Sequence, residues 1–185
     1  MTPVPIPQNP YLADKVISQM QQQLKSKLSW LDYSFGRAQR LVERRDNKDY
    51  YYPGVYVGSR EYVNVLPTEQ YGNFSFFQLE DSTKILWQSR TISKITNRFA
   101  IIFWFNLSKI YTGDTDRDTE RIKEEVLKAF SQILLTEGSF TIDTIYENHN
   151  NIYKGYGLNE VDHQHLMHPF GALRLEGEIT YTQTC

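Results

Sequence analysis

Apolar residues recur at every fourth position near the start of the chain, which predicts an amphipathic helix. The recurring residues are Leu12, Val16, Met20, Leu24 and Leu28. Asn9 is a good N-cap residue and Pro10 suits the first helical position, so we expect the helix to begin near Pro10. One apolar stripe of this helix would then pack on a core.

A second stretch with helical periodicity begins near Thr119, and it has one apolar and one charged stripe. The apolar stripe consists of Ile122, Val126, Ala129, Phe130 and Ile133. We expect Gly138 to end this helix, because glycine readily adopts the left-handed conformation that closes many helices.

The strongest strand signal is the continuous apolar run AIIFWF at residues 100–105, which is typical of a strand buried on both faces. We expect this strand to be central in a sheet. Shorter runs with two-residue periodicity predict further strands, and Gly58-Ser59 would form the turn of a hairpin. These runs are VYVGSREYV, NFSFFQLE, SFTIDTIYE and ALRLEGEITYT.

This order of elements predicts an α+β fold, in which two principal helices pack on a mainly antiparallel sheet. Residues 1–9 are expected to form an extended N-terminal arm, because Pro3, Pro5 and Pro7 fix φ and lack an N–H donor. Residues 10–185 would form a single domain with an extended loop or hairpin insertion at about 35–90. The sequence has no Gly-rich phosphate loop between a strand and a helix, which disfavours the nucleotide-binding folds.

The insertion contains a basic-aromatic stretch, RLVERRDNKDYYYPG, which we expect to be a loop. It combines basic and aromatic residues, among them Arg44, Arg45, Lys48, Tyr50, Tyr51 and Tyr52. Such a loop could stack on nucleic-acid bases, or it could bind another protein, since Arg and Tyr dominate interface hot spots. Acidic neighbours and a formal net charge of -2 favour the protein interface. The arm at 1–9 is either a frayed terminus or a second contact with a neighbouring subunit.

Three histidines near the end of the chain raise the question of a metal site. His163 and His165 lie beside Asp162, and His168 follows shortly after them. Zinc requires three or four converging ligands, whereas a histidine-bearing loop before a strand needs no metal. We therefore expect a loop here. A small metal-dependent enzyme using His163, His165 and Asp162 is the alternative function.

Acidic residues before the second helix partly match a calcium-binding loop. The matching residues are Asp114, Asp116, Asp118 and Glu125. However, Thr119 stands where the sharp turn of such a loop needs glycine, and carboxylates also collect at helix N-termini because of the helix dipole. We expect no calcium site here. Because no other catalytic set emerges, we predict that the protein needs no cofactor and is not an enzyme.

The remaining composition limits the compartment. Cys185 is the only cysteine, so no internal disulfide can form. The start of the sequence lacks a basic stretch followed by an apolar core, so we expect no secretory signal. The longest apolar run, FAIIFWF, is too short to span a bilayer. We therefore expect an intracellularly made, soluble protein with no membrane partner.

The order of elements and the closing segment resemble the tail-terminator or tail-completion proteins of tailed bacteriophages, which include head–tail connector and neck-ring proteins. The segment PFGALRLEGEITYT carries most of this resemblance, with a proline–aromatic break, an arginine in the strand and an alternating terminal strand. The likeness covers most of the chain from Tyr11 onward. The Tyr- and Asn-rich composition is also similar to that of crAss-like phages.

The resemblance implies a structural virion protein that forms a ring at the portal–tail junction or at the top of the tail tube. Its partners would be copies of itself, in a hexamer or dodecamer, together with portal or connector and tail proteins. DNA would pass through the lumen without specific contact, and the chain would be made in the host cytoplasm without a cofactor. The interface residues would be Arg44, Arg45, Tyr50, Tyr51, Tyr52, Pro3, Pro5 and Pro7.

Overall fold

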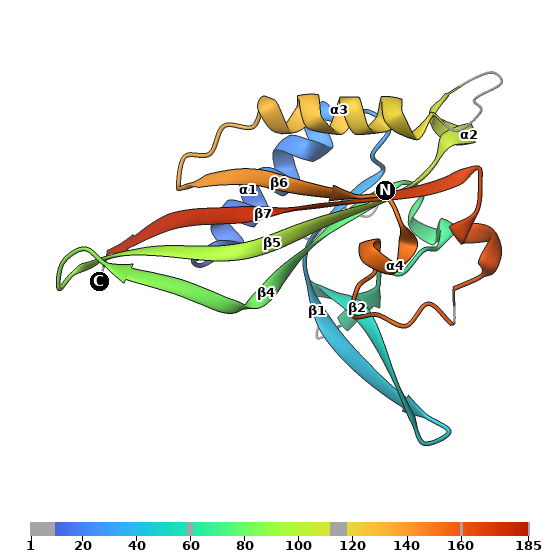
Figure 1. Ribbon diagram of the computed structural model, residues 1–185, viewed down its shortest axis with the longest axis horizontal. Coiled ribbons are helices and arrows are strands. Elements are labelled where there is room, and N and C mark those ends of the chain that lie inside the picture. The colour runs from blue at the N-terminus through green and yellow to red at the C-terminus, as the bar shows by residue number, and fades with distance from the viewer. Residues whose placement is uncertain (1–9, 59–60, 112–117, 160, 185) are drawn as a thin grey trace.

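The computed structural model describes residues 10–58, 61–111, 118–159 and 161–184 (Figure 1). The two long helices are α1 (Ala13–Lys27) and α3 (Thr119–Ser131). The short helical turns are α2 (Leu107–Ile110), α4 (His149–Ile152), η1 (Glu69–Tyr71) and η2 (His163–Leu166). The strands are β1 (Tyr33–Arg45), β2 (Lys48–Gly58), β3 (Glu61–Asn64), β4 (Phe74–Trp87), β5 (Ile92–Asn106), β6 (Ser139–Tyr146) and β7 (Phe170–Thr184).

The strands in this described part of the chain form one seven-stranded sheet, in the order β3-β2-β1-β4-β5-β7-β6. β1 and β4 run parallel, and every other pair of neighbours is antiparallel. The predicted α+β fold, with two principal helices on a mainly antiparallel sheet, is confirmed. Within the same residues, we find no helix with the length and apolar character needed to cross a membrane.

β5 is the central core strand, as its apolar run predicts, because its side chains fill the cores on both faces of the sheet. Ile101 and Phe103 pack in a first cluster with the apolar stripes of α1 and α3. Ile102 and Trp104 point to the opposite face and pack in a second cluster that includes Ile152 of α4. Figure 1 shows the consequence, with α1 and α3 on one side of the sheet and α4 away from them.

Both long helices depart from their predicted bounds at one end. α1 begins at Ala13 rather than near Pro10, and Leu12 before it has a φ of 52°. The predicted N-cap, Asn9, lies outside the described residues. α3 begins at Thr119 as predicted, but it ends at Ser131 rather than at Gly138. Gly138 instead has a φ of 111° in the turn before β6, where a Cβ would lie 2.5 Å from the backbone oxygen of Thr180.

The stretch predicted to be a basic-aromatic loop is instead the outer half of a hairpin, so the loop prediction was wrong. β1 and β2 pair without interruption from Ala38–Val55 out to Arg45–Lys48. Asp46 and Asn47 form the turn with φ of 49° and 58°, a conformation that short Asx side chains tolerate and that matches the twist of paired strands. The residues expected as an insertion at about 35–90 contribute β1 to β4, which are strands of the sheet itself.

The second predicted hairpin, around Gly58-Ser59, is present as the antiparallel pair of β2 and β3. Tyr56 faces Tyr62 across this pair, with their ring centres 5.3 Å apart. Gly58 has a φ of 98°, a conformation that glycine adopts without steric cost. The other turn residue, Ser59, lies outside the described residues.

Candidate functional site

The β1–β2 hairpin places the predicted interface residues on an arm that projects from the body of the protein (Figure 1). Residues 42–49 are all exposed, so the outer half of this hairpin has little packing support from the rest of the described chain. Its backbone ladder and its two-residue turn hold it in shape. Arg44 and Arg45 end one strand, and Tyr50, Tyr51 and Tyr52 lie on the other.

The register of the hairpin divides the predicted residues between its two faces. Tyr51 pairs with Val42, whereas Tyr50 pairs with Glu43. Successive residues of a strand point to opposite faces, so Tyr51 and Arg44 share one face, and Tyr50, Tyr52 and Arg45 share the other. Arg45 donates hydrogen bonds to Glu43 on that second face, at 2.6 Å. The five residues therefore do not form one cluster.

Arg40 is a surface residue that the sequence did not single out, and it completes the face on which Tyr51 lies. Its guanidinium carbon lies 3.9 Å from the ring centre of Tyr51, a cation–π geometry. Val42 lies beside Tyr51 and is 56% exposed. We call Arg40, Val42, Arg44 and Tyr51 the hairpin outer face. It combines a stacked aromatic ring, a bare aliphatic side chain and two cations.

A hollow of about 400 Å³ separates the hairpin from the loop at residues 155–159. It is lined by Arg40, Lys48, Asp49, Tyr50, Tyr51, Gly155, Tyr156, Gly157 and Asn159. The N–H of Gly157 donates a hydrogen bond to the backbone oxygen of Tyr51 at 2.9 Å, which ties the loop to the hairpin. Burial raises the pKa of Tyr156 to about 12, and its phenolic oxygen has no partner among the described residues.

The histidine segment is engaged in local structure. Asp162 caps the turn η2, where its carboxylate accepts hydrogen bonds from the backbone N–H of Gln164 at 3.1 Å and from its side chain at 2.9 Å. The ring of His165 packs edge-on against Trp104 and Phe170, and its backbone oxygen accepts a hydrogen bond from the Trp104 indole. In the described ranges, no group of three or more His, Cys, Asp or Glu side chains is placed to hold a metal ion.

The acidic segment before α3 also has local roles where it is described. Asp118 precedes the first residue of α3. Glu125 accepts hydrogen bonds from the Trp30 indole at 3.0 Å and from the Tyr111 hydroxyl at 3.1 Å, so it joins α3 to its neighbours. Burial and this hydrogen bond raise the pKa of Tyr111. Asp114 and Asp116 lie outside the described residues.

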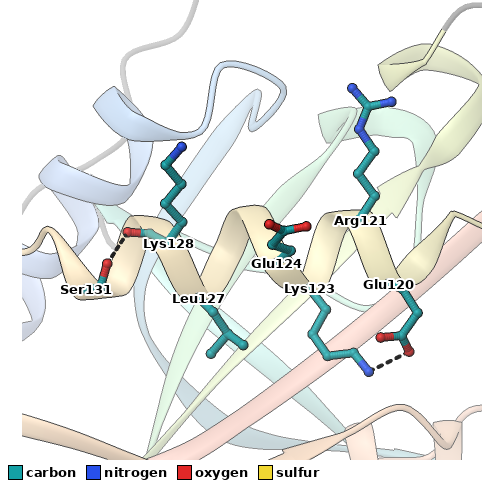
Figure 2. A pocket seen from close by; sticks show the side chains of 7 residues that line it. All are labelled: Glu120, Arg121, Lys123, Glu124, Leu127, Lys128 and Ser131. Carbon is teal, nitrogen blue, oxygen red and sulfur yellow. Dashed lines mark hydrogen bonds and ion pairs between the residues drawn. The ribbon is translucent and has the colours of Figure 1, made fainter.

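The solvent-facing side of α3 forms a shallow hollow, which Figure 2 shows from close by. Lys123 pairs with Glu120 at 2.6 Å and with Glu147 at 2.5 Å. Arg121 lies over the ring of Tyr111, 4.1 Å from its centre. These charges are satisfied within the chain and face water, which is the ordinary state of an amphipathic helix, so we assign no site here.

Some predicted interface residues cannot be placed on these surfaces. Pro3, Pro5 and Pro7 lie outside the described residues, as does the whole arm at 1–9. No protein-family model matches the sequence, and a search of the curated proteins finds no match. Function is therefore inferred from the surfaces described above and from the resemblance of the sequence.

Proposed function

We propose that this protein is a structural subunit of a tailed-phage virion, which forms a ring at the portal–tail junction or at the top of the tail tube. The observation that carries the proposal is the projecting β1–β2 hairpin with its exposed outer half. A folded chain gains little by extending paired strands away from its own core, because the outer residues bury no apolar surface there. Such an arm gains stability when a partner covers it.

The chemistry of the hairpin outer face suits a protein partner. Tyrosine and arginine are enriched at interface hot spots, because each buries a large flat surface and still donates hydrogen bonds at its edge. Arg40 already holds the ring of Tyr51 in place, which lowers the entropy that binding would cost. Asp49 and Glu43 lie among the basic residues, and such mixed charge disfavours a dedicated phosphate-binding surface.

A ring subunit must present two different faces to its neighbours, since a head-to-tail contact closes only at a fixed rotation. In this proposal the hairpin reaches one neighbour or the portal, and the arm with Pro3, Pro5 and Pro7 supplies a further contact. The formal net charge of -2 suits a channel through which DNA slides, because a strongly basic lumen would hold the phosphates. Such a subunit needs no cofactor.

The test is the protein content of intact particles. Mass spectrometry of purified virions should detect the chain in a small, fixed number of copies per portal. If the chain is abundant in infected cells but absent from intact virions, the structural proposal fails. That result would direct attention to the alternative, an enzyme using His163, His165 and Asp162, although Asp162 and His165 already have structural partners here.

A further inference from the structure

The tip of the β4–β5 hairpin carries the densest exposed apolar group in the described chain. Ile85, Leu86 and Trp87 are 55%, 63% and 61% exposed, and Ile92 across the turn is 36% exposed. The register pairs Ile85 with Ile95 and Trp87 with Ser93, whereas Leu86 faces Lys94, so the tip is apolar on both faces. Contiguous exposed apolar surface of this kind marks an interaction site more often than chance exposure.

The tip is built as a fixed structure. The backbone N–H groups of Gln88 and Ser89 donate hydrogen bonds to the oxygen of Ile92, and the Ser89 hydroxyl accepts from the N–H groups of Thr91 and Ile92. β7 pairs with β5 as far as Ile92, so a third strand supports the hairpin almost to its end. Figure 1 shows this ribbon extending well beyond the helices. A preformed tip loses little entropy on binding.

The same chain carries an apolar groove at a different place, between the C-terminal end of α3 and the strand β6. Its apolar lining includes Leu127, Phe130, Leu134, Leu135, Phe140 and Ile142, around a volume of about 530 Å³. Leu134 is 80% exposed and Leu127 is 41% exposed. In Figure 2 the Leu127 side chain points away from the side of α3 that carries Arg121 and Lys128. Within the described residues β6 pairs with β7 alone, so its outer edge borders the groove.

The charges beside the tip and beside the groove are opposite. Residues 84–94 contain Lys84, Arg90 and Lys94 and no acid, and Lys84 lies 3.6 Å from the carboxylate of Glu178 on β7. Residues 134–145 contain Glu137 and Asp143 and no base. Both carboxylates have a cation of their own chain, Lys15 at 2.9 Å and Arg98 at 2.7 Å, and are about half exposed. Their contribution is therefore to orientation and association rate more than to affinity.

We propose that the tip of the β4–β5 hairpin of one copy docks in the α3–β6 groove of the next copy. The occupant is a second copy because one chain carries both an apolar knob and an apolar groove with opposite flanking charges. The contact is head-to-tail, which builds rings or open filaments. The inference that this contact joins the subunits of a virion ring rests on the proposed function. The contact between two copies can also form outside a virion.

Site-directed cross-linking tests this contact in the full chain. The test variant carries three substitutions: Gln88→Cys beside the tip, Ser131→Cys in the groove, and Cys185→Ser to remove the natural cysteine. The concentrated protein is treated with a short bis-maleimide, which links two nearby cysteines. Gln88 and Ser131 are both exposed, so neither change disturbs the core. We expect a ladder of covalent oligomers. Adding Trp87→Ser should abolish the ladder, because the apolar contact is lost.

A matched control places the second cysteine away from the groove. Ser108→Cys lies on α2, is exposed like Ser131, and should give no ladder when it is combined with Gln88→Cys. A ladder that is equally strong with Ser108→Cys, or no ladder with Ser131→Cys, overturns the proposed contact. A Trp and Leu tip with basic neighbours also suits a membrane surface. The second assay therefore measures binding to vesicles of phosphatidylcholine and phosphatidylserine. If the protein binds them, Trp87→Ser abolishes that binding and no ladder forms, the tip is a lipid-binding site and the proposal is overturned.

The outcome is separable from the proposed function. If the chain is present in virions, and the same two cysteines in assembled particles give no cross-link, the docking contact is wrong while the structural role stands. If the ladder forms in solution but the chain is absent from virions, the contact stands and the virion role fails.

Discussion

The buried guanidinium of Arg174 donates a hydrogen bond at 2.7 Å to the carboxylate of Glu176, two positions along β7. Arg174 is 4% exposed, and it also donates to the side-chain oxygen of Gln78 and to the backbone oxygen of Ile152. These bonds join β7 to β4 and to the end of α4. Arg174 therefore holds the α4 segment to the sheet beside the second core cluster.

Replacing Arg174 alone should be strongly destabilising. Arg174→Met leaves the oxygen of Ile152 without this donor, and it leaves the carboxylate of Glu176 with the longer contact to Arg98 at 3.9 Å. The cost should therefore lie at the low end of that for breaking a buried pair, about 3 kcal/mol. Adding Glu176→Leu should recover much of that loss, because an apolar pair needs no desolvated charge. Urea denaturation of the three proteins measures both effects. A single variant as stable as the wild type would show that the pair contributes little.

A charge in the centre of β5 should unfold the protein. Ile102 is fully buried between β4 and β7, so the carboxylate of Ile102→Asp would lose its hydration. Arg174 stands opposite on β7, but its guanidinium is already bonded to Glu176, Gln78 and Ile152. That cost is several kcal/mol, on the order of the whole free energy of unfolding of a domain. Ile102→Val is the control and should cost about 1 kcal/mol. A soluble variant Ile102→Asp with a cooperative thermal transition would contradict the central placement of this strand.

Alkaline pH should destabilise the protein through Tyr156. Burial raises the pKa of Tyr156 from 10.0 to about 12, so the stability of the folded state is intact below pH 10 and falls as pH rises towards 12. Relative to Tyr156→Phe, the wild type should lose about 2 kcal/mol by pH 12. The buried Tyr153 shifts in the same direction in both proteins, so the difference isolates Tyr156. Parallel curves of unfolding free energy against pH would contradict this assignment.

Replacing an exposed histidine should change the stability of the protein less than replacing a packed one. His163 is exposed, and His163→Ala should leave the melting temperature unchanged. His165→Ala removes the edge-on contacts with Trp104 and Phe170 and should cost about 1 kcal/mol. A chelator should not change the melting temperature of the wild type. If a chelator lowers it and added zinc restores it, the metal-dependent alternative is supported instead.

The parts of the fold that could be predicted are those in which burial sets the pattern. Residues 100–105 are apolar at every position because β5 has a core on each face, and no solvated alternative exists for such a run. The β1–β2 hairpin leaves no such pattern, because both faces of its outer half are exposed and its residues follow no alternation. The Asp46-Asn47 pair is the signal in this segment, since such residues tolerate the positive φ of a two-residue turn.

The candidate surfaces were harder to predict than the fold, because they depend on register. Arg40 and Tyr51 meet only because Val42 pairs with Tyr51, a fact that follows from the position of the turn. The α3–β6 groove arises between segments whose apolar residues, taken alone, are indistinguishable from core residues. Exposure of Leu134 and Trp87 is a property of the packed chain, and periodicity does not report it.

One face of the β1–β2 hairpin should matter for virion assembly more than the other. Tyr51→Ser removes from the hairpin outer face the aromatic ring on which Arg40 stacks. We expect about tenfold fewer copies of the chain per particle, because truncating a hot-spot side chain weakens an interface by at least that factor. Tyr50→Ser is the matched control, since it makes the same substitution one residue away on the opposite face. Circular dichroism should show both variants folded, and quantitative mass spectrometry of particles measures the copies. Equal losses from both variants would implicate the stability of the hairpin rather than a contact of its outer face, and undiminished incorporation of Tyr51→Ser would remove that face from the interface.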